Sequence, residues 1–177
     1  AILGGTLVTV AAIGAVIVAS KLSKINTVKL DTDKLSVSKE AKKRGSGYLN
    51  VALFGVDSRD NDLDKGTRSD TIMIASLNKK TMKVKIASIY RDTLSEQEDG
   101  TLNKINAAYS YGGPEGALSV LNKNLDMNIE HYVTVNFNSM IDIVDSVGGI
   151  DIDVQEDEVP YICGYVQEIM KVTGKLS

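Results

Sequence analysis

The sequence predicts a layered α/β/α sandwich with a mixed central sheet, preceded by a transmembrane helix. Three observations lead to this fold class. An apolar segment opens the chain at residues 1–20, and two strand-length apolar runs follow at residues 50–56 and 71–77. Beyond residue 104, segments with helical spacing of apolar residues alternate with strand-like segments. Interleaved helices and strands are typical of one sheet covered by helices.

The first 20 residues contain no charged side chain, and a helix of this length would span about 30 Å, the core of a bilayer. We therefore expect a transmembrane anchor. A signal peptide and a buried core helix are the alternatives, but the apolar part exceeds the roughly 7 to 15 residues of a signal-peptide core. Residues 21–47 are polar and rich in lysine, which predicts a linker to a domain that starts at residue 48.

The stretch from residue 50 to residue 92 predicts three antiparallel strands. The loop between the first two apolar runs is too polar for a crossover helix, which favours antiparallel pairing. A turn at residues 78–81 leads into residues 82–86, where apolar residues alternate with lysine as in a half-buried strand. With this pairing the chain returns to one end of the sheet, and residues far apart in the sequence converge there.

The residues expected at this end suit a pyrophosphate. Two carboxylates without a nearby histidine or cysteine suit a hard cation, and Mg²⁺ is typically held by one or two carboxylates together with phosphate oxygens. Arginine adds a planar fork that matches phosphate. A solvated rim of turn charges is the alternative. The converging residues are Asp57, Arg59, Arg68, Asp70 and Arg91.

The rest of the chain predicts further helices and strands. Lys104 opens a short helix that ends at Gly112-Gly113, and Pro114 then lies in the first turn of a second helix. Residues 131–136 predict a strand, and Asn138 is expected to cap the helix that follows. The alternation of Ile150, Ile152 and Val154 predicts a last strand.

Composition argues against other function classes. The net charge is -3 and the pI about 5.2, so the basic excess of a nucleic-acid-binding protein is missing. His131 and Cys163 are the single histidine and cysteine, so an intrachain disulfide is excluded and a Ser-His-Asp hydrolase has little support.

Five segments together resemble the successive motifs of the LytR-CpsA-Psr (LCP) family. They occur in order, with suitable gaps, over about residues 49–177, and none of them would be specific alone. The segments are Asn50–Arg59, Arg68–Ile72, Ser88–Thr93, Lys104–Tyr109 and Val144–Ile150.

The resemblance implies a single-pass protein of the cell membrane with an extracellular catalytic domain. It implies a phosphotransferase that moves a phosphate-linked glycopolymer, such as teichoic acid or capsular polysaccharide, from a polyprenyl-pyrophosphate carrier to peptidoglycan. It also implies an N-terminus inside the cell, although Lys21 and Lys24 read alone favour the opposite orientation.

Matched to the family motifs, Asp57 and Asp70 are expected to bind Mg²⁺. Arg59, Arg68, Arg91 and Lys104 are expected at the pyrophosphate, and Arg68, Arg91 and Asp92 are the candidate catalytic residues. Asp92 is a candidate proton acceptor only if it does not hold Arg91.

The resemblance also implies an apolar tunnel for the polyprenyl chain, and the sequence leaves open which apolar residues form the core and which form the tunnel. The family continues past Ser177, so we expect a fragment or a truncated copy, whose domain (residues 48–177) is incomplete. A non-catalytic polyprenyl-phosphate-binding protein is the alternative function, and a transcriptional regulator has the least support. The core or tunnel candidates are Leu118, Leu121, Val133, Val135, Ile141 and Val144.

Overall fold

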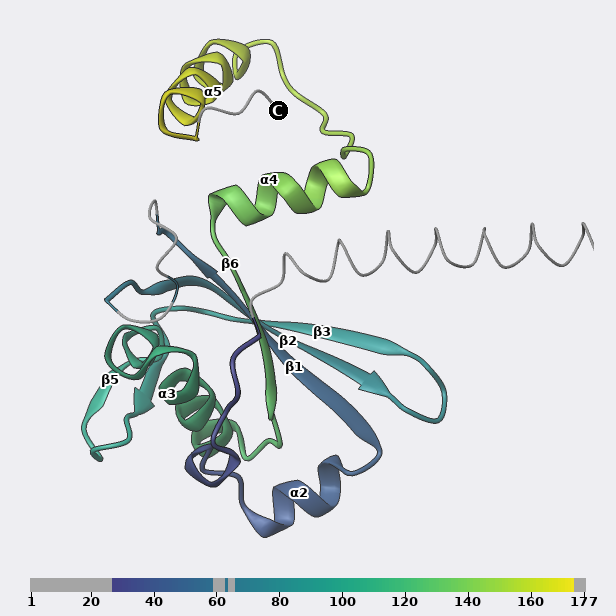
Figure 1. Cartoon of the computed structure of the whole chain (residues 1–177), viewed down its shortest axis with the longest axis vertical. Helices are drawn as coiled ribbons and strands as arrows, with labels where there is room; N and C mark the ends of the chain where they lie inside the picture. Colours follow the sequence, from purple (N-terminus) through teal and green to yellow (C-terminus); the bar gives the residue numbers. More distant parts are fainter. Residues whose placement is uncertain (1–26, 59–62, 64–65, 174–177) are drawn as a thin grey trace, which may run out of the picture. The chain divides into compact units, whose positions relative to one another are not determined.

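The computed structural model describes residues 27–58, 63 and 66–173 (Figure 1). The chain divides into two compact units, Ala1–Leu30 and Asp31–Ser177, and every helix and strand of the described residues belongs to the second. Within the described ranges no helix is long and apolar enough to cross a membrane. The predicted anchor at residues 1–20 and the predicted site residue Arg59 both lie outside them.

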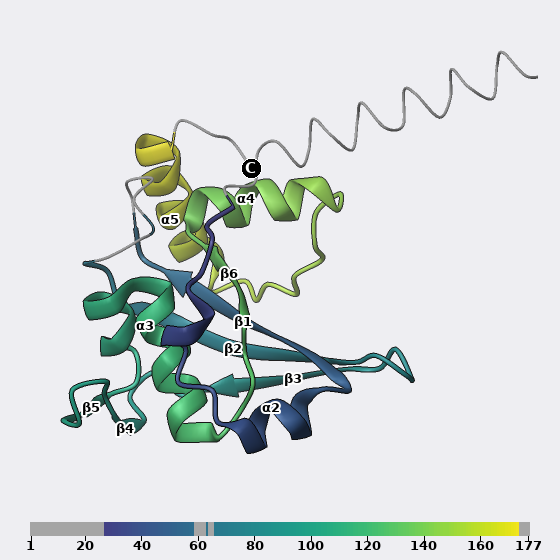
Figure 2. The same cartoon turned by 60° about the horizontal axis from the view of Figure 1, so that its bottom comes forward.

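A four-stranded mixed sheet forms the centre of the second unit, as predicted. Strands β1 (Tyr48–Val56), β2 (Ser69–Asn78) and β3 (Val84–Ile89) are antiparallel neighbours, while β6 (His131–Val135) is parallel to β1. The order in the sheet is therefore β3-β2-β1-β6 (Figure 2). The predicted antiparallel arrangement of the first three strands is confirmed.

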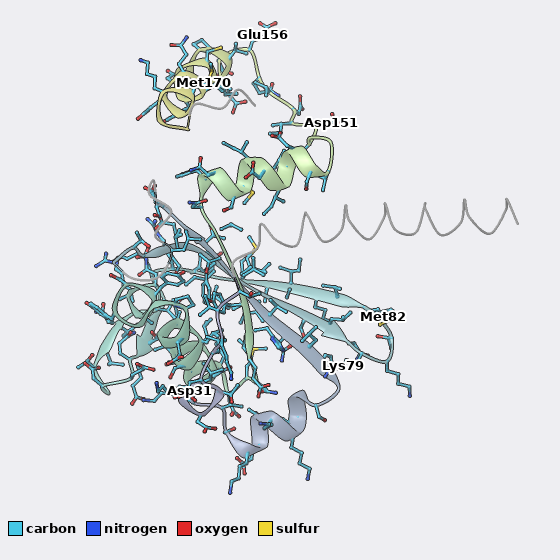
Figure 3. The ribbon with its side chains drawn as sticks, viewed as in Figure 1. Asp31, Lys79, Met82, Asp151, Glu156 and Met170 are labelled. Atoms are coloured by element: carbon cyan, nitrogen blue, oxygen red, sulfur yellow. The ribbon has the colours of Figure 1, made fainter. Side chains whose placement is uncertain are left out.

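The turn between β2 and β3 ends two residues later than predicted. The Asn78 side chain accepts hydrogen bonds from the backbone N–H groups of Lys80 and Thr81, at 3.0 and 2.9 Å. Met82 follows with a positive φ of 56°, which ends the extended conformation before β3. Met82 and Lys79 both lie at the turn end of this hairpin (Figure 3). The third strand consequently starts at residue 84, not 82.

Helix α3 (Ala107–Leu125) covers one face of the sheet and contains a kink. Gly113 has a φ of 63° and a ψ of -157°, so the helix breaks there and restarts at Pro114. This backbone conformation is accessible almost only to glycine. The predicted stop at Gly112-Gly113 and the restart with proline are therefore both present, although the two pieces follow each other without a loop.

The core lies between α3 and this face of the sheet. Alternate residues of β1, including Ala52 and Phe54, are buried, as are Leu118 and Leu121 of α3. The Tyr109 ring packs edge-on against Phe54 with a centroid distance of 5.2 Å. A buried alternate row on one strand is the pattern of a sheet with one face packed against a helix.

A short hairpin precedes α3 where the sequence predicted an acidic loop and a helix that starts at Lys104. Lys104 instead ends the second strand of the hairpin, and the helix starts at Ala107. Strands β4 (Leu94–Glu96) and β5 (Leu102–Lys104) pair antiparallel, and Leu94 is opposite Lys104. The backbone turns between them at Gly100, which has a φ of 82°. Strands of three residues leave too little periodicity for a prediction from sequence.

The segment before β1 is folded onto α3, although the sequence placed it in a linker. It contains the 3-10 helix η1 (Thr32–Lys34) and helix α2 (Lys39–Gly45). Leu35 is completely buried, and its carbonyl accepts a hydrogen bond from the buried Asn122 side chain at 2.9 Å. The Ser36 and Ser119 hydroxyls are 2.7 Å apart. From Asp31 on, this segment belongs to the same compact unit as the sheet.

The chain after β6 departs from two predictions. Asn136, not Asn138, caps helix α4 (Phe137–Ser146), since its side chain accepts a hydrogen bond from the Ser139 N–H at 2.9 Å. The predicted strand around Ile150 and Ile152 is wrong: these residues are irregular and 62% and 69% exposed, and helix α5 (Val159–Thr173) follows. An alternating pattern gives a strand only where a neighbouring strand can satisfy its backbone groups.

Candidate functional site

The end of β1 and the start of β2 bring the two predicted metal ligands to one end of the sheet. Val56 is opposite Ser69 and Gly55 is opposite Thr71, so Asp70 is the extra residue of a bulge. Asp57 directly follows Val56, and both aspartates are exposed. Bulges commonly re-aim a side chain next to a site. The two aspartates therefore leave the same end of the β1–β2 pair, as predicted.

Strand β3 returns to this end and delivers Arg91. Ile89 of β3 is opposite Ile72 of β2, two residues beyond Asp70. Arg91 Nη1 donates a hydrogen bond to Asp70 Oδ1 at 2.5 Å. The predicted approach of Arg91 to Asp70, 21 positions apart in the sequence, is thus present.

Asp92 lies between two cations. Lys104 Nζ donates to Asp92 Oδ1 at 2.5 Å, and Arg91 Nε is 3.8 Å from Asp92 Oδ2. The hydrogen bond from Lys104 is the main cause that lowers the pKa of Asp92 below its ordinary value, and the positive charges of Lys104, Arg91 and Arg68 lower it further. Asp92 is therefore in contact with Arg91, and the sequence made Asp92 a candidate proton acceptor only without such a contact.

The backbone around β4 and β5 explains how Lys104 reaches this site. The Ile105 N–H donates to the Thr93 carbonyl at 2.8 Å, and the Asn106 N–H donates to the Arg91 carbonyl at 3.3 Å. These two bonds continue the β4–β5 pairing toward Arg91. Lys104 and Asp92 are consequently held as neighbours, which the sequence alone did not predict.

We refer to Asp57, Arg68, Asp70, Arg91, Asp92 and Lys104 as the charged cluster. The paired side chains of the cluster are about half exposed, between 47% for Asp70 and 58% for Asp92. The cluster contains three carboxylates and three cations, so it carries no net charge by itself. An open surface of this kind is accessible to a charged ligand and screened by solvent, so its ion pairs contribute little to folding stability.

The carboxylates of the cluster fit a magnesium ion in number and type. Asp57 and Asp70 provide two hard oxygen ligands at the same end of the sheet, as many as Mg²⁺ usually takes from protein when phosphate oxygens and water complete its coordination. Among the described residues there is no group of three histidine, cysteine or acidic side chains that could hold a metal without such a ligand. The donor set thus suits a metal that arrives with a phosphate.

Two polar residues beside the cluster were missed by the sequence reasoning. Within the described part of the chain, Ser69 Oγ and Asn106 Oδ1 are buried without a hydrogen-bond partner. Asn106 precedes α3, yet its side chain does not cap the helix as an asparagine at this position usually does. Ser69 lies in the same family-like segment as Arg68, and Asn106 in the same segment as Lys104. This position in the sequence could have identified both residues.

The apolar residues that were expected in the core or the tunnel differ in how far they are buried. Leu118 and Leu121 are fully buried in the core under α3. Val133 pairs with Leu53 on the opposite face of the sheet and is 48% exposed, and Val135 is partly exposed. Ile141 and Val144 lie on α4 and are partly exposed.

Two concave pockets occur away from the charged cluster. One of about 200 Å³ lies between the β4–β5 turn and α3, lined by residues such as Glu98 and Tyr111. The other, of about 340 Å³, lies between β3 and the end of α3, beside Ile86 and Met127. Neither lining contains a residue of the cluster. Charge and hydrogen bonding, not concavity, single out the site.

Comparisons with known proteins show what this chain is similar to. A model of the LytR_cpsA_psr family matches residues 13–175. The chain is 39% identical over 126 residues to the polyisoprenyl-teichoic acid–peptidoglycan teichoic acid transferase TagU of Bacillus cereus (strain AH820), which covers 71% of this chain and 40% of that protein. The chain therefore spans less than half the length of the curated relatives it matches.

Solved structures share the fold. The crystal structure of B. subtilis TagV has a TM-score of 0.54 and 35% identity, over 60% of this chain and 43% of that one. The LytR-CPS2A-psr family protein YwtF (TagT) with bound octaprenyl pyrophosphate lipid has a TM-score of 0.55 and 25% identity, over 85% of this chain and 52% of that one. The mixed α/β class is thereby confirmed. Because the family model matches residues 13–175, nearly the whole sequence, the chain belongs to the LytR_cpsA_psr family.

Proposed function

We propose that this chain carries the pyrophosphate-binding part of a phosphotransferase. The enzyme would move a phosphate-linked glycopolymer, teichoic acid or capsular polysaccharide, from a polyprenyl-pyrophosphate carrier to peptidoglycan. A relative named as a teichoic acid transferase and a family structure with a bound prenyl pyrophosphate support this class of reaction. The observation that carries the proposal is the continuous series of contacts from Asp70 through Arg91 and Asp92 to Lys104.

Asp57 and Asp70 are the residues that would hold Mg²⁺. The metal supplies neutralisation of charge on the pyrophosphate oxygens when it is bound. The chain's own contribution is to present both carboxylates from one end of the β1–β2 pair, where Asp70 is the extra residue of a bulge. Oxygen ligands without histidine or cysteine favour Mg²⁺ over zinc or copper.

Arg68, Arg91 and Lys104 would bind the phosphoryl oxygens. A sugar hydroxyl of the acceptor attacks the phosphorus that carries the glycopolymer, and the bond from this phosphorus to the oxygen of the polyprenyl phosphate breaks. The proton of the hydroxyl leaves with the polyprenyl phosphate. Phosphoryl transfer depends chiefly on positioning and on stabilising charge at the phosphoryl oxygens, and side chains held before the substrate arrives do this without reorganisation. The contacts of Arg91 and Lys104 with aspartates provide this preorganisation.

The prenyl chain would lie on apolar side chains of the sheet face turned away from α3. Leu53 and Val133 are partly exposed there, whereas Leu118 and Leu121 are enclosed in the core. We further propose that residues 1–20 anchor the protein in the cell membrane as a single-pass helix, with the domain extracellular. That location matches a lipid-linked donor and a cell-wall acceptor.

A transfer assay tests the proposal. The full 177-residue chain, solubilised in detergent, is incubated with a polyprenyl-pyrophosphate-linked glycan, a peptidoglycan oligomer and Mg²⁺, and the linked product is measured by mass spectrometry. We expect product with Mg²⁺ and none with EDTA. Arg91→Ala should lower the rate by about 10² to 10³, the usual cost of one preorganised group that stabilises developing charge.

Arg44→Ala is the matched control. Arg44 also forms an exposed ion pair, with Asp126, but it lies in α2 near the start of β1, whereas the charged cluster lies at the end of β1. It should leave the rate unchanged. Binding of the lipid without transfer would instead support a non-catalytic binding protein. Equal loss of transfer in both arginine variants would show that the charged cluster has no special part in the reaction.

A further inference from the structure

The position of Asp92 indicates a task different from proton transfer. We propose that Asp92 is a positioning residue that holds the Lys104 ammonium and the Arg91 guanidinium in the orientation that binds the pyrophosphate. The inference rests on the proposed function, because it concerns the same ligand. It assigns a role to a carboxylate whose negative charge, taken alone, would repel that ligand.

Each carboxylate oxygen of Asp92 faces a different cation. Oδ1 accepts the hydrogen bond from Lys104 Nζ at 2.5 Å, and Oδ2 lies 3.8 Å from Arg91 Nε. The Nη1 group of Arg91 is engaged by Asp70 at 2.5 Å. Arg91 is therefore held from two sides, while Lys104 is held by Asp92 at its charged end.

The backbone fixes the bases of these side chains but not their tips. The bonds from Ile105 N–H to the Thr93 carbonyl and from Asn106 N–H to the Arg91 carbonyl join the two segments. Lysine has one of the most mobile side chains, and the Lys104 side chain is 54% exposed. The orientation of its ammonium group consequently depends on Asp92.

The same surroundings make Asp92 a weak base. The hydrogen bond from Lys104 keeps its pKa below the ordinary value, and the charges of Arg91 and Arg68 act in the same direction. A general base works best when its pKa lies near the operating pH. A carboxylate in contact with Lys104 and Arg91, whose pKa they lower, is suited to orienting these two cations and poorly suited to accepting a proton.

Binding of inorganic pyrophosphate with Mg²⁺, measured by isothermal titration calorimetry on the full chain in detergent, separates the explanations. If Asp92 only contributes negative charge, Asp92→Asn removes repulsion and binding becomes tighter. If Asp92 were the general base, its loss would slow transfer and leave ground-state binding unchanged. If it positions Lys104 and Arg91, we expect Asp92→Asn to weaken binding about tenfold, the effect of losing a coupling between contacting residues.

Two further variants assign the effect to Lys104. In a Lys104→Met background, Asp92→Asn should weaken pyrophosphate binding clearly less than in the wild type, because the ammonium group that Asp92 orients is already absent. Glu96→Gln is the matched control. Glu96 lies on β4, the strand that pairs with the strand of Lys104, and its exposed carboxylate is 2.8 Å from the Lys123 ammonium. It should leave pyrophosphate binding as in the wild type.

The outcomes are distinguishable. A wild-type chain that binds no pyrophosphate overturns the proposed function together with this inference. A wild-type chain that binds, with an Asp92→Asn variant that binds as tightly or more tightly, overturns the role of Asp92 alone. Equal melting temperatures of the variants, by circular dichroism, verify that a loss of binding is not a loss of folding.

Discussion

The Arg91 guanidinium and the Asp70 carboxylate form a hydrogen-bonded ion pair at 2.5 Å across the end of strands β2 and β3. Asp70 is also a proposed ligand of Mg²⁺. The metal and Arg91 would therefore draw on the same carboxylate, and a bound metal also repels a nearby guanidinium. Binding of the metal would therefore weaken the pair with Asp70 and leave the Arg91 guanidinium, still in contact with Asp92, available to the phosphate.

This competition predicts opposite effects of one variant on the two ligands. Arg91→Ala should raise the affinity for Mg²⁺ measured without pyrophosphate, because Asp70 is no longer engaged, and lower the affinity for pyrophosphate. Isothermal titration with Mg²⁺, or electron paramagnetic resonance with Mn²⁺, measures the first effect. Arg44→Ala should change neither affinity. A fall in metal affinity with Arg91→Ala would contradict the assignment of Asp70 as a ligand.

Leu35 is completely buried although the sequence places it in a polar linker. Leu35→Ala should lower the free energy of unfolding by about 2 to 5 kcal/mol, the usual cost of a large-to-small change in a core. Urea unfolding monitored by circular dichroism measures the change. Leu102→Ala is the control, because Leu102 is 68% exposed and should alter stability by less than about 0.5 kcal/mol. Equal effects of the two variants would mean that residues 31–47 are not part of the folded unit.

Gly113 adopts a backbone conformation that side chains disfavour. Gly113→Ala should destabilise the protein by about 1 to 3 kcal/mol, the cost of a strained backbone position. Gly47→Ala serves as a comparison, since a Cβ at Gly47 meets no atom within 4 Å and no positive φ is recorded there. Thermal unfolding of both variants tests the difference. A Gly113→Ala variant as stable as the wild type would show that the kink is not required.

Asp126 gives the domain a dependence on acid. Its pKa is lowered, first by the hydrogen bond from the Ser38 hydroxyl at 2.8 Å and then by Arg44. A lowered folded-state pKa contributes stability that is fully present above the ordinary aspartate value of about 4 and is lost as the pH falls through the folded value. NMR titration should find the pKa of Asp126 below that ordinary value, and Ser38→Ala should raise it. A pKa that Ser38→Ala leaves unchanged would refute this cause.

The sequence by itself determined the convergence of Asp57, Asp70 and Arg91. Short polar connections force the first three strands to be antiparallel neighbours, and this local constraint fixes which strand ends meet. The helix break at Gly113 was equally readable, because glycine followed by proline restricts the backbone at that point.

Only the tertiary structure decided how Lys104 joins the cluster and where the domain begins. Lys104 meets Asp92 through a hairpin whose three-residue strands leave no sequence pattern, and Leu35 is buried through contacts with residues more than 80 positions away. The strand predicted from the alternation at residues 150–154 did not form, because a strand needs a neighbouring strand to pair with, and the alternation of apolar residues does not provide one. Local rules fix conformation and pairing between adjacent strands, whereas contacts between distant segments depend on packing that the sequence pattern does not encode.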